Sequence, residues 1–383
     1  MSETLISIPF NRPPGADGGG PHVLDALASA HWAGDGSYTR RCGELLEAEL
    51  SIPKALLTTS CTHALEMAGF LLDLEPGDEV IVPSFTFVSS ANAFAVRNAR
   101  PVFADVRPDT LNIDEDRLER LITPKTKAIV VVHYAGIGCE MDAIMPLAEE
   151  RGIAVVEDNA HGLFGRYRGR YLGTFGTFAT QSFHETKNFT CGEGGALLIN
   201  DPAFIERAEI IREKGTDRSK FFRGQVDKYG WVDLGSSYLP SDILAAILLA
   251  QLEDRNRIQN RRREIWLRYR EALEPWAERL GLGLPSVPHH CDQSYHMFYL
   301  LTPSLEDRQA FIAHLRSSGI LAVFHYQPLH LSRMGRLLGG SEGQCPVTED
   351  VSERLVRLPF YTDLDSDDLE FVIERILTWR PKA

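Results

Sequence analysis

The 383-residue sequence has no uninterrupted apolar stretch long enough to cross a bilayer, and its first residues do not combine a charged segment with an apolar one. Cysteine is scarce, and its spacing is not typical of a disulfide framework or a zinc cluster. These absences predict a soluble, cytoplasmic protein with no metal site and no membrane partner. The cysteines are Cys42, Cys61, Cys139, Cys191, Cys291 and Cys345.

Positive charge is also in deficit, because 40 lysines and arginines stand against 53 aspartates and glutamates. The formal net charge of −13 argues against a nucleic-acid partner, whose phosphates would repel the chain. The local cluster Arg261-Arg262-Arg263 is more typical of a solvated helix face than of a binding site. A hydrophobic content of 44% is ordinary for a globular protein.

Short apolar runs alternate with helical patterns between residues 54 and 200, and they predict seven strands. Because the runs are apolar throughout rather than at alternate positions, we expect one large α/β sheet with helices on both faces. The predicted strands are 55–57, 79–82, 101–104, 128–132, 154–157, 177–180 and 196–199.

The chain is longer than one ordinary core requires, so we expect two lobes. A long helical stretch over 240–275 precedes a region with a different order of predicted elements. In that region, strands 297–301 and 322–324 flank a helix over 305–318. This pattern predicts a smaller α+β domain. We place the larger domain at residues 1–248 and the smaller one at residues 249–383.

Lys187 stands between an apolar strand-like run and the glycine-rich turn of residues 192–195. Burial there would favour the neutral amine, which is the form that makes a Schiff base with a carbonyl or an aldehyde cofactor. Taken alone, the segment fits a partly exposed loop lysine better.

Ligands of open α/β sheets bind at the carboxyl ends of the strands, and one such end is followed by Ser60-Cys61-Thr62. These residues open a helix, whose first amides and dipole suit a phosphate group. Ser60 or Thr62 could instead simply cap the helix.

Two more strand ends carry suggestive side chains. Asp158 follows the run 154–157, where a buried carboxylate needs a cationic partner, although a helix cap or a structural ion pair would also satisfy it. Phe87 lies just beyond the run 79–82 and could cover a cofactor ring or belong to the core.

Together the four features describe one ligand, pyridoxal phosphate. Its phosphate would lie on the helix start, an aromatic side chain would cover its ring, and Lys187 would bind its aldehyde. Asp158 would pair with the protonated ring nitrogen, which makes the ring a better acceptor of electrons during amino transfer. The coincidence of all four features is much less expected by chance than any one of them.

Several segments carry a resemblance that covers nearly the whole chain: residues 34–36, 60–62, 182–188 (Ser-Phe-His-Glu-Thr-Lys-Asn), 221–229, 235–239 and 323–326. Through them the chain resembles the DegT/DnrJ/EryC1/StrS sugar aminotransferases. That resemblance implies a fold type I transferase of the aspartate aminotransferase kind, with pyridoxal phosphate as its cofactor.

Carried over to this sequence, the resemblance implies a role for each matching residue. Lys187 would be the Schiff-base lysine and proton shuttle, Asp158 would hold the ring nitrogen, Phe87 would stack on the ring, and His161 would lie near the phenolic oxygen. The phosphate would be bound by Cys61, Thr62 and Ser182, and by Ser237 from the neighbouring subunit of a homodimer with shared active sites. The chain departs from many relatives by carrying Cys61 in place of glycine or alanine and Ser237 in place of asparagine.

The resemblance also implies the substrates, L-glutamate as donor and a dTDP-linked 4-keto-6-deoxyhexose as acceptor. A diphosphate needs cations or hydrogen-bond donors, for which the candidates are Arg223, Lys228, His325 and Tyr326. Arg223 and Lys228 equally fit ordinary surface charges.

Three alternatives to this function stay open on the sequence. One is a sugar aminotransferase with another ketone position or product configuration, such as a 3-keto acceptor or a gluco product. Another is a sugar dehydratase of the same fold, against which Lys187 argues because those relatives carry histidine there. The last is a non-catalytic sensor of the cofactor or of a sugar nucleotide.

Overall fold

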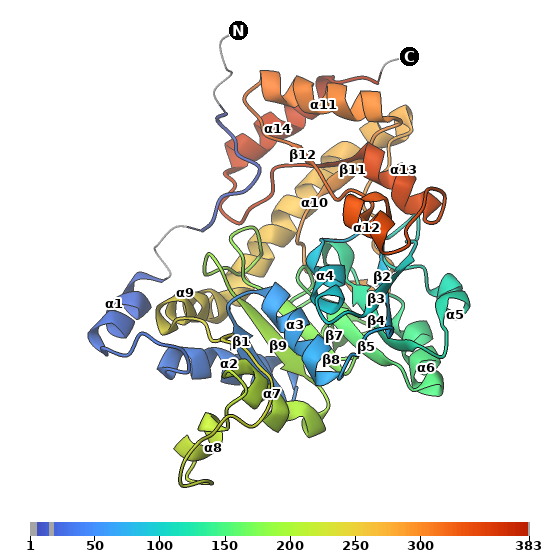
Figure 1. Cartoon of the computed structure of the whole chain (residues 1–383). Coiled ribbons are helices and arrows are strands. Elements are labelled where there is room, and N and C mark those ends of the chain that lie inside the picture. The colour runs from blue at the N-terminus through green and yellow to red at the C-terminus, as the bar shows by residue number, and fades with distance from the viewer. Residues whose placement is uncertain (1–5, 15–18, 382–383) are drawn as a thin grey trace.

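A seven-stranded sheet forms the centre of the protein in a computed structural model that describes residues 6–14 and 19–381 (Figure 1). The spatial order is β1-β9-β8-β5-β4-β2-β3. β9 runs antiparallel to both neighbours, and every other adjacent pair is parallel. These strands coincide with the seven predicted runs: β1 (Lys54–Thr58), β2 (Glu79–Pro83), β3 (Arg100–Ala104), β4 (Thr126–Val132), β5 (Ala154–Asp158), β8 (Phe178–Ser182) and β9 (Gly195–Ile199).

Helices cover both faces of this sheet, because successive side chains of a strand point to opposite sides and both sets are apolar. Leu56 of β1 belongs to the core under α3, whereas Leu57 belongs to the core under α2 and α9. The prediction of one large α/β sheet is therefore confirmed. The helices around it are α1 (Gly20–Ala28), α2 (Ser37–Leu50), α3 (Cys61–Leu71), α4 (Ser89–Ala95), α5 (Leu118–Leu121), α6 (Met141–Arg151), α7 (Ile205–Arg212), α8 (Arg218–Phe222) and α9 (Asp242–Glu253).

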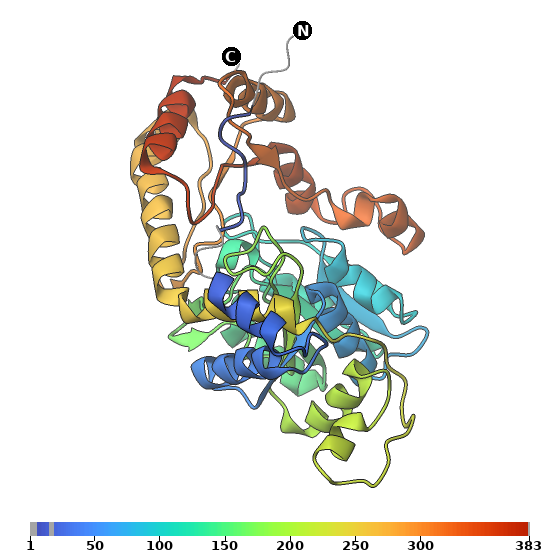
Figure 2. The same cartoon turned by 90° about the vertical axis from the view of Figure 1, so that its left-hand side faces the viewer.

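A smaller antiparallel sheet in the order β11-β13-β12 lies in the C-terminal part of the chain. It shares a separate apolar core with the long helix α10, and Ile8 of the N-terminal segment joins that core. Figure 2 shows that segment running along this part of the structure. The elements here are β11 (Tyr299–Leu301), β12 (Val323–Phe324), β13 (Leu355–Arg357), α10 (Arg255–Leu280), α11 (Leu305–Ser317), α12 (Arg333–Leu337), α13 (Pro346–Arg354) and α14 (Ser366–Thr378).

A third, short sheet joins the two parts, because β10 (Cys291–Asp292) pairs with β6 (Arg166–Tyr167), which pairs with β7 (Arg170–Tyr171). The division into two lobes stays a proposal. The boundary predicted between residues 248 and 249 falls inside α9, whose apolar residues belong to the core of the large sheet. We therefore propose that the smaller lobe begins within α10.

Two expectations for the C-terminal half need correction. The helix predicted over 240–275 is two helices that meet at Asp254. Arg262, expected on a solvated face, is buried and donates hydrogen bonds to the carbonyl oxygens of Tyr295 at 3.0 Å and His296 at 2.6 Å. Consecutive residues of a helix point about 100° apart, so one member of a charged run can face inward.

Across residues 6–14 and 19–381, no helix combines the length and apolarity that spanning a membrane requires.

Glu157 is a buried carboxylate that holds the turn between β7 and β8 against β5. Its Oε1 accepts hydrogen bonds from the backbone N–H groups of Phe175 at 2.6 Å and Gly176 at 2.7 Å. Its Oε2 accepts from the N–H of Gly173 at 2.7 Å and lies 2.8 Å from Nε2 of His133. All four partners lose their acceptor when this side chain is removed.

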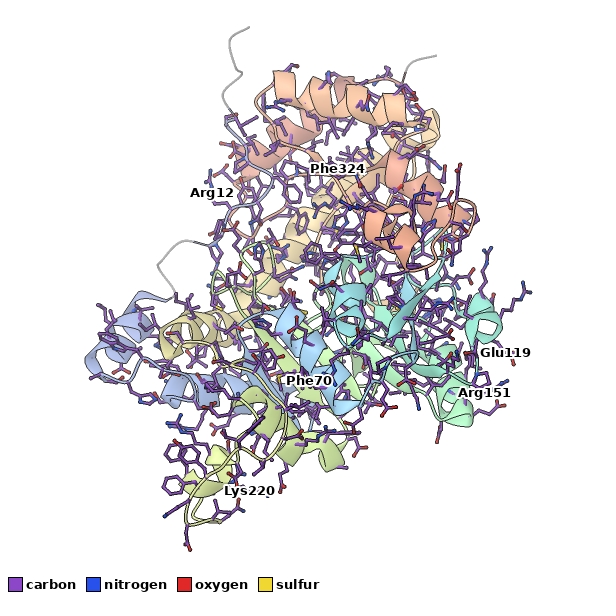
Figure 3. The ribbon with its side chains drawn as sticks, viewed as in Figure 1. Arg12, Phe70, Glu119, Arg151, Lys220 and Phe324 are labelled. Atoms are coloured by element: carbon purple, nitrogen blue, oxygen red, sulfur yellow. The ribbon has the colours of Figure 1, made fainter. Side chains whose placement is uncertain are left out.

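We expect Glu157→Ala to lower the free energy of unfolding by about 3 kcal/mol, because buried donors are left unpaired. Urea denaturation followed by circular dichroism measures the change. Glu119→Ala is the matched control: this glutamate is 68% exposed beside Arg151 (Figure 3), and its removal should change stability by less than about 0.5 kcal/mol. Similar losses in the two variants would contradict the assigned role of Glu157.

Candidate active site

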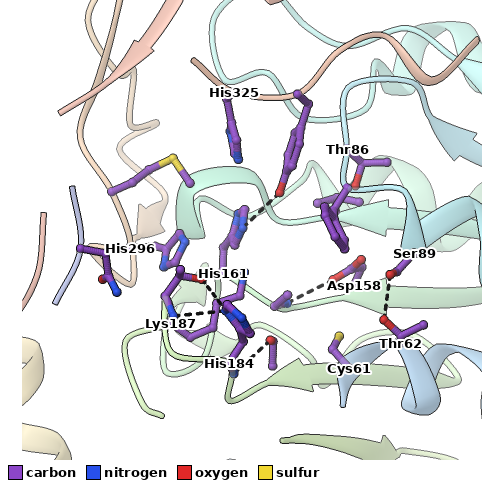
Figure 4. A pocket seen from close by; sticks show the side chains of 18 of the residues that line it. Cys61, Thr62, Thr86, Ser89, Asp158, His161, His184, Lys187, His296 and His325 are labelled. Atoms are coloured by element: carbon purple, nitrogen blue, oxygen red, sulfur yellow. Dashed lines mark hydrogen bonds between the residues drawn. The ribbon is translucent and has the colours of Figure 1, made fainter. Parts of the chain in front are cut away.

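The carboxyl ends of β5 and β8 and the start of α3 open onto one cavity of about 720 Å³ (Figure 4). Side chains of the C-terminal part of the chain, the proposed smaller lobe, line its other side. The cavity brings together most of the residues predicted for the site: Cys61, Thr62, Phe87, Asp158, His161, Ser182, Lys187, His325 and Tyr326.

The other three predicted residues lie elsewhere in the single chain. Ser237 and Arg223 line a separate cavity of about 1000 Å³, and Lys228 is exposed and lines neither cavity. Nη1 of Arg223 pairs with Oε2 of Glu209 at 2.8 Å, which is the surface-charge role left open by the sequence. The predicted contact of Ser237 is to a neighbouring subunit, so it stays a prediction.

The start of α3 is held against the hairpin of β8 and β9. A Cβ atom on Gly195 would lie 2.3 Å from the carbonyl carbon of Ser60, so only glycine permits this approach. The Ser60 side chain caps the helix by accepting the N–H of His63 at 3.2 Å. Helix geometry leaves the N–H groups of Cys61 and Thr62 without an acceptor inside the helix. The helix start therefore combines the capping role with two amides suited to an anion.

Asp158 ends β5 and is buried at the floor of the cavity. Oδ2 accepts a hydrogen bond from Oγ of Ser90 at 2.6 Å, and Oδ1 accepts one from the N–H of Ala160 at 3.2 Å. Ser90 is in turn 2.8 Å from Oγ1 of Thr86. These neutral partners orient the carboxylate without supplying a cation, so its charge is available to a ligand in the cavity.

Lys187 lies in the loop between β8 and β9, in a turn closed by its N–H donating to the carbonyl of His184 at 2.9 Å. The next residue, Asn188, anchors the loop to the smaller lobe. Its Nδ2 donates to the carbonyl oxygen of Ser294 at 2.7 Å, and its Oδ1 lies 2.9 Å from Nδ1 of His296. The backbone of Lys187 is therefore held by the turn to His184 and by the contacts of Asn188. Its side chain is directed into the cavity (Figure 4).

Burial lowers the pKa of Lys187 to about 8, against opposing contributions from Cys61 and Asp158, while the positive charge of Arg357 adds to the lowering. At pH 7 about one amine in ten is then neutral, compared with roughly one in 2,500 for an unperturbed lysine. The loop thus supplies a usable nucleophile near neutral pH.

This shift predicts how the free lysine reacts with pH. In the cofactor-free protein, modification of Lys187 by trinitrobenzenesulfonate should rise with pH and level off above a midpoint near 8, because only the unprotonated amine attacks. Mass spectrometry of the peptide that contains residue 187 measures the rate. Lys187→Arg removes the signal and is the control, while a midpoint above 10 would contradict the shift.

Three histidines and two tyrosines line or back the side of the cavity facing the smaller lobe. His161 stacks on His296 with ring centroids 4.2 Å apart, and its Nε2 lies 3.5 Å from the hydroxyl of Tyr326. Nδ1 of His325 is 2.7 Å from the hydroxyl of Tyr134. Burial holds the pKa of all three imidazoles well below the ordinary value, so the rings are neutral at pH 7.

Phe87 and Cys61 also belong to the predicted set. Phe87 is 57% exposed, which is unusual for a core phenylalanine, and its ring lies 6.4 Å from that of Tyr326. Burial, followed by the charge of Asp158, raises the pKa of the Cys61 thiol, so it stays protonated and narrows the cavity without adding charge.

Several residues that line or support the cavity were not predicted from the sequence. Ser89 lines it, with its Oγ 2.7 Å from Oγ1 of Thr62, and Ser90 lies behind it and donates a hydrogen bond to Asp158. Both serines belong to the stretch after Phe87, where a Ser-Ser pair before a helical pattern was the only signal. The smaller lobe and the N-terminal segment add Phe10, Asn11, His296 and Arg357.

The residues present fit pyridoxal phosphate. The helix start offers amides for a phosphate, and the orientation of Asp158 suits a protonated ring nitrogen. Nδ1 of His161 is buried and has no hydrogen-bond partner within the described residues, which fits a polar ligand atom beside it. Lys187 offers the amine that an aldehyde requires.

Comparisons with known proteins agree with this fit. A model of the DegT/DnrJ/EryC1/StrS aminotransferase family matches residues 21–377. The pleiotropic regulatory protein of Geobacillus stearothermophilus is 35% identical over 315 residues, which are 82% of this chain and 80% of that protein. The structure of Spr1654 from Streptococcus pneumoniae, which carries the name of a sugar aminotransferase, is known in its pyridoxal phosphate (PLP) form. It is 29% identical to this chain, covers 97% of this chain and 98% of its own, and has a TM-score of 0.89. PseC of Helicobacter pylori, an aminotransferase involved in the biosynthesis of pseudoaminic acid, is 26% identical, with 97% and 98% covered and a TM-score of 0.86.

Proposed function

Because the chain belongs to the DegT/DnrJ/EryC1/StrS aminotransferase family, we propose that it transfers the amino group of L-glutamate to C4 of dTDP-4-keto-6-deoxy-D-glucose. The protein is a sugar aminotransferase of fold type I, and its cofactor is pyridoxal phosphate. The proposed product is dTDP-4-amino-4,6-dideoxy-D-galactose, which makes the enzyme a dTDP-4-amino-4,6-dideoxygalactose transaminase. The observation that carries the proposal is the amine of Lys187 in one cavity with the carboxylate of Asp158 and the start of α3.

The finer substrate assignment is supported by the sequence segments that resemble one subgroup, above all residues 221–229 and 323–326. His325 and Tyr326 of the second segment line the cavity, where neutral hydrogen-bonding groups suit the hydroxyls of a hexose. We propose that the acceptor sugar lies against them. A deoxyamino sugar of this kind would feed enterobacterial common antigen, lipopolysaccharide or a secondary metabolite made in the cytoplasm.

Each residue at the bottom of the cavity has a role in this proposal. Cys61, Thr62 and Ser182 would hold the cofactor phosphate, Asp158 would pair with the ring nitrogen, Phe87 would cover the ring and His161 would lie beside the phenolic oxygen. When bound, pyridoxal phosphate supplies an electron-withdrawing ring that stabilises negative charge on the carbon that loses its proton.

Lys187 acts twice. Its neutral Nζ would hold the aldehyde of the cofactor until the amine of the donor takes its place. Once free, Nζ takes the proton from the α-carbon of glutamate, and in the second half of the cycle it returns a proton to C4 of the sugar. Its lowered pKa keeps the amine able to accept a proton near neutral pH. Water supplies the keto oxygen of 2-oxoglutarate, which leaves between the two halves, and one water is released when the ketone of the sugar takes up the nitrogen.

We propose that two copies of the chain form a homodimer with shared active sites. The arm formed by residues 218–234 projects from the large sheet, and Lys220 marks it in Figure 3. It exposes apolar side chains that are costly in water, among them Phe222 at 70% and Trp231 at 78%. A second copy covering this arm would bring Arg223, Lys228 and Ser237 near the partner's cavity, where they would serve a phosphate or diphosphate.

The proposal is tested by incubating the purified protein with L-glutamate and dTDP-4-keto-6-deoxy-D-glucose. We expect 2-oxoglutarate and an amino sugar nucleotide in equal amounts. Proton NMR of the product then assigns the carbon that bears nitrogen and its configuration, since an axial amine at C4 gives small couplings to H4. A 3-amino sugar or an equatorial amine would contradict the proposed product and would mean that the enzyme is a sugar aminotransferase of another specificity.

The name of the Geobacillus relative keeps a regulatory function as the second candidate. A sensor would bind pyridoxal phosphate or the sugar nucleotide without releasing 2-oxoglutarate from glutamate. The same incubation therefore separates the two candidates, and a single turnover of the cofactor-loaded protein with glutamate is enough to decide.

A further inference from the structure

Tyr134 is a fully buried tyrosine whose hydroxyl joins the two sides of the cavity. It follows β4 of the large sheet, and its hydroxyl lies 2.7 Å from Nδ1 of His325, which follows β12 in the proposed smaller lobe. Oδ1 of Asn112 accepts the N–H of Tyr134 at 2.9 Å. The tyrosine ring packs against Phe85 and Tyr299, with centroid distances of 5.3 and 5.9 Å. The hydroxyl is therefore held in one position.

The hydrogen bond between these two side chains sets which nitrogen of His325 carries a hydrogen. Burial holds the pKa of His325 well below its ordinary value, so the ring is neutral and has one N–H group. Within residues 6–14 and 19–381, the hydroxyl of Tyr134 has no other hydrogen-bond partner. If Nδ1 carried the hydrogen, the phenolic hydrogen would be buried without an acceptor, which is unfavourable. The hydroxyl therefore donates to Nδ1, and the hydrogen of the ring is on Nε2.

Nε2 of His325 is left as a donor on the cavity side of this pair. The ring lines the cavity and is directed into it in Figure 4. No group in the described part of the chain forms a hydrogen bond with Nε2. The ring stacks on that of Tyr326, with centroids 3.6 Å apart and planes inclined by 26°, which restricts its rotation. The cavity thus presents a fixed, uncharged N–H group to a ligand.

The surroundings of this donor point to the reacting end of the sugar. The ring centroid of His325 lies 6.2 Å from that of His161, which closely follows the end of β5, and the charge of Lys187 contributes to the lowered pKa of His325. Carboxylates and phosphates form their strongest hydrogen bonds with charged donors, whereas a ketone oxygen is uncharged. A hydroxyl could bind either form of the ring, but a ketone oxygen can only accept. A hydrogen fixed on Nε2 therefore selects for a ketone.

We propose that His325 donates a hydrogen bond from Nε2 to the ketone oxygen of the acceptor sugar, and that Tyr134 is the positioning residue that fixes this donor. The inference rests on the proposed function and assigns the group that meets its ketone. A neutral imidazole can polarise a carbonyl in this way without giving up its proton. The hydrogen bond makes the carbonyl carbon more open to attack by nitrogen. His325 is then a catalytic residue, and Tyr134 acts through it.

Solid-state nitrogen-15 NMR of the histidine-labelled, cofactor-loaded protein tests the position of the hydrogen. At pH 7 we expect the His325 signals, assigned by their loss in His325→Gln, to show a hydrogen on Nε2 and none on Nδ1. Tyr134→Phe should shift the Nδ1 signal because it removes the hydrogen bond. Tyr269→Phe is the matched control, since it removes a buried hydroxyl that donates to the carbonyl oxygen of Pro359 at 2.9 Å, and it should leave the His325 signals unchanged. A hydrogen on Nδ1 of His325 in the wild type would overturn the proposal.

Single turnovers of protein preloaded with pyridoxamine phosphate and mixed with the keto sugar nucleotide test the effect on the reaction. We expect His325→Leu to lower the maximal rate by about 100-fold, because one preorganised donor to the reacting oxygen is lost. The sugar nucleotide concentration that gives half of that rate should change little. Tyr134→Phe should lower the rate by about tenfold, and His325→Gln, whose amide can donate, should be faster than His325→Leu. Release of 2-oxoglutarate from L-glutamate by the pyridoxal phosphate form should change by less than about threefold in all three variants.

Two kinetic outcomes would contradict the assignment. Equal slowing of both half-reactions in Tyr134→Phe would mean that its hydroxyl only supports the fold. A loss in His325→Leu that appears only as weaker binding of the sugar nucleotide would indicate a hydroxyl contact in place of the ketone. If the wild type aminates no keto sugar, the proposed function fails and the ketone contact fails with it, while the NMR measurement still decides which nitrogen of His325 donates.

Discussion

Replacing Lys187 with alanine should lower the rate of amino transfer by at least about 10⁴-fold while leaving the protein able to bind pyridoxal phosphate. The substitution removes both the amine that holds the aldehyde and the base that moves the proton, and general acid–base catalysis alone accounts for about 10²–10⁴-fold. Binding persists because the start of α3 and Asp158 remain in place. The rate of 2-oxoglutarate release from L-glutamate and the equilibrium uptake of cofactor measure the two effects separately.

The covalent part of this role has its own readout. Reduction of the cofactor-loaded wild type with borohydride should attach the cofactor to the peptide that contains residue 187, and Lys187→Arg should show no labelled peptide. Lys125→Ala, which removes an exposed lysine before β4, is the matched control and should keep full activity and labelling. More than about 1% of wild-type activity in Lys187→Arg would contradict the role of Lys187 in binding the aldehyde and moving the proton.

The large sheet was predictable because its strands are buried on both faces, so each strand is a continuous apolar run that stands out from the helices around it. The same regularity located Asp158 and Ser60-Cys61-Thr62, because β1 and β5 run in the same direction and the residues that follow them lie at one edge of the sheet. Lys187 alone fits a partly exposed loop lysine, and it became recognisable only together with Asp158, the helix start at Ser60-Cys61-Thr62 and the resemblance carried by residues 182–188.

The smaller lobe was harder to predict. β13 is a strand of three residues that directly continues α13, so no separate run of strand-like residues marks it, and Arg357 at its end was missed. Nothing in the sequence distinguishes Ser90 from the other serines. It follows β2, whereas Asp158 ends β5, and only the fold brings the two side chains together. Such contacts between elements distant in sequence leave no periodic signal. The same limit applies to Arg262, whose burial depends on which face of α10 meets the smaller lobe.

The second large effect is expected at Asp158. Replacing it with asparagine should slow the release of 2-oxoglutarate from glutamate by about 10³-fold, roughly 4 kcal/mol of transition-state stabilisation. An amide cannot stabilise a protonated ring nitrogen, and an unprotonated ring is a much poorer acceptor of the electrons left behind when the α-proton departs. Single-turnover absorbance of the cofactor-loaded protein after mixing with glutamate measures the rate, and cofactor binding should weaken far less.

Two comparisons separate this electronic role from loss of structure. A cofactor methylated at its ring nitrogen carries a permanent positive charge, so it should restore Asp158→Asn by at least tenfold while it does not improve wild type. Ser90→Ala keeps the carboxylate but removes the hydrogen bond that orients Oδ2, and we expect it to lose only about tenfold. A methylated cofactor that fails to help Asp158→Asn, together with an equal loss in Ser90→Ala, would mean that Asp158 merely shapes the floor of the cavity.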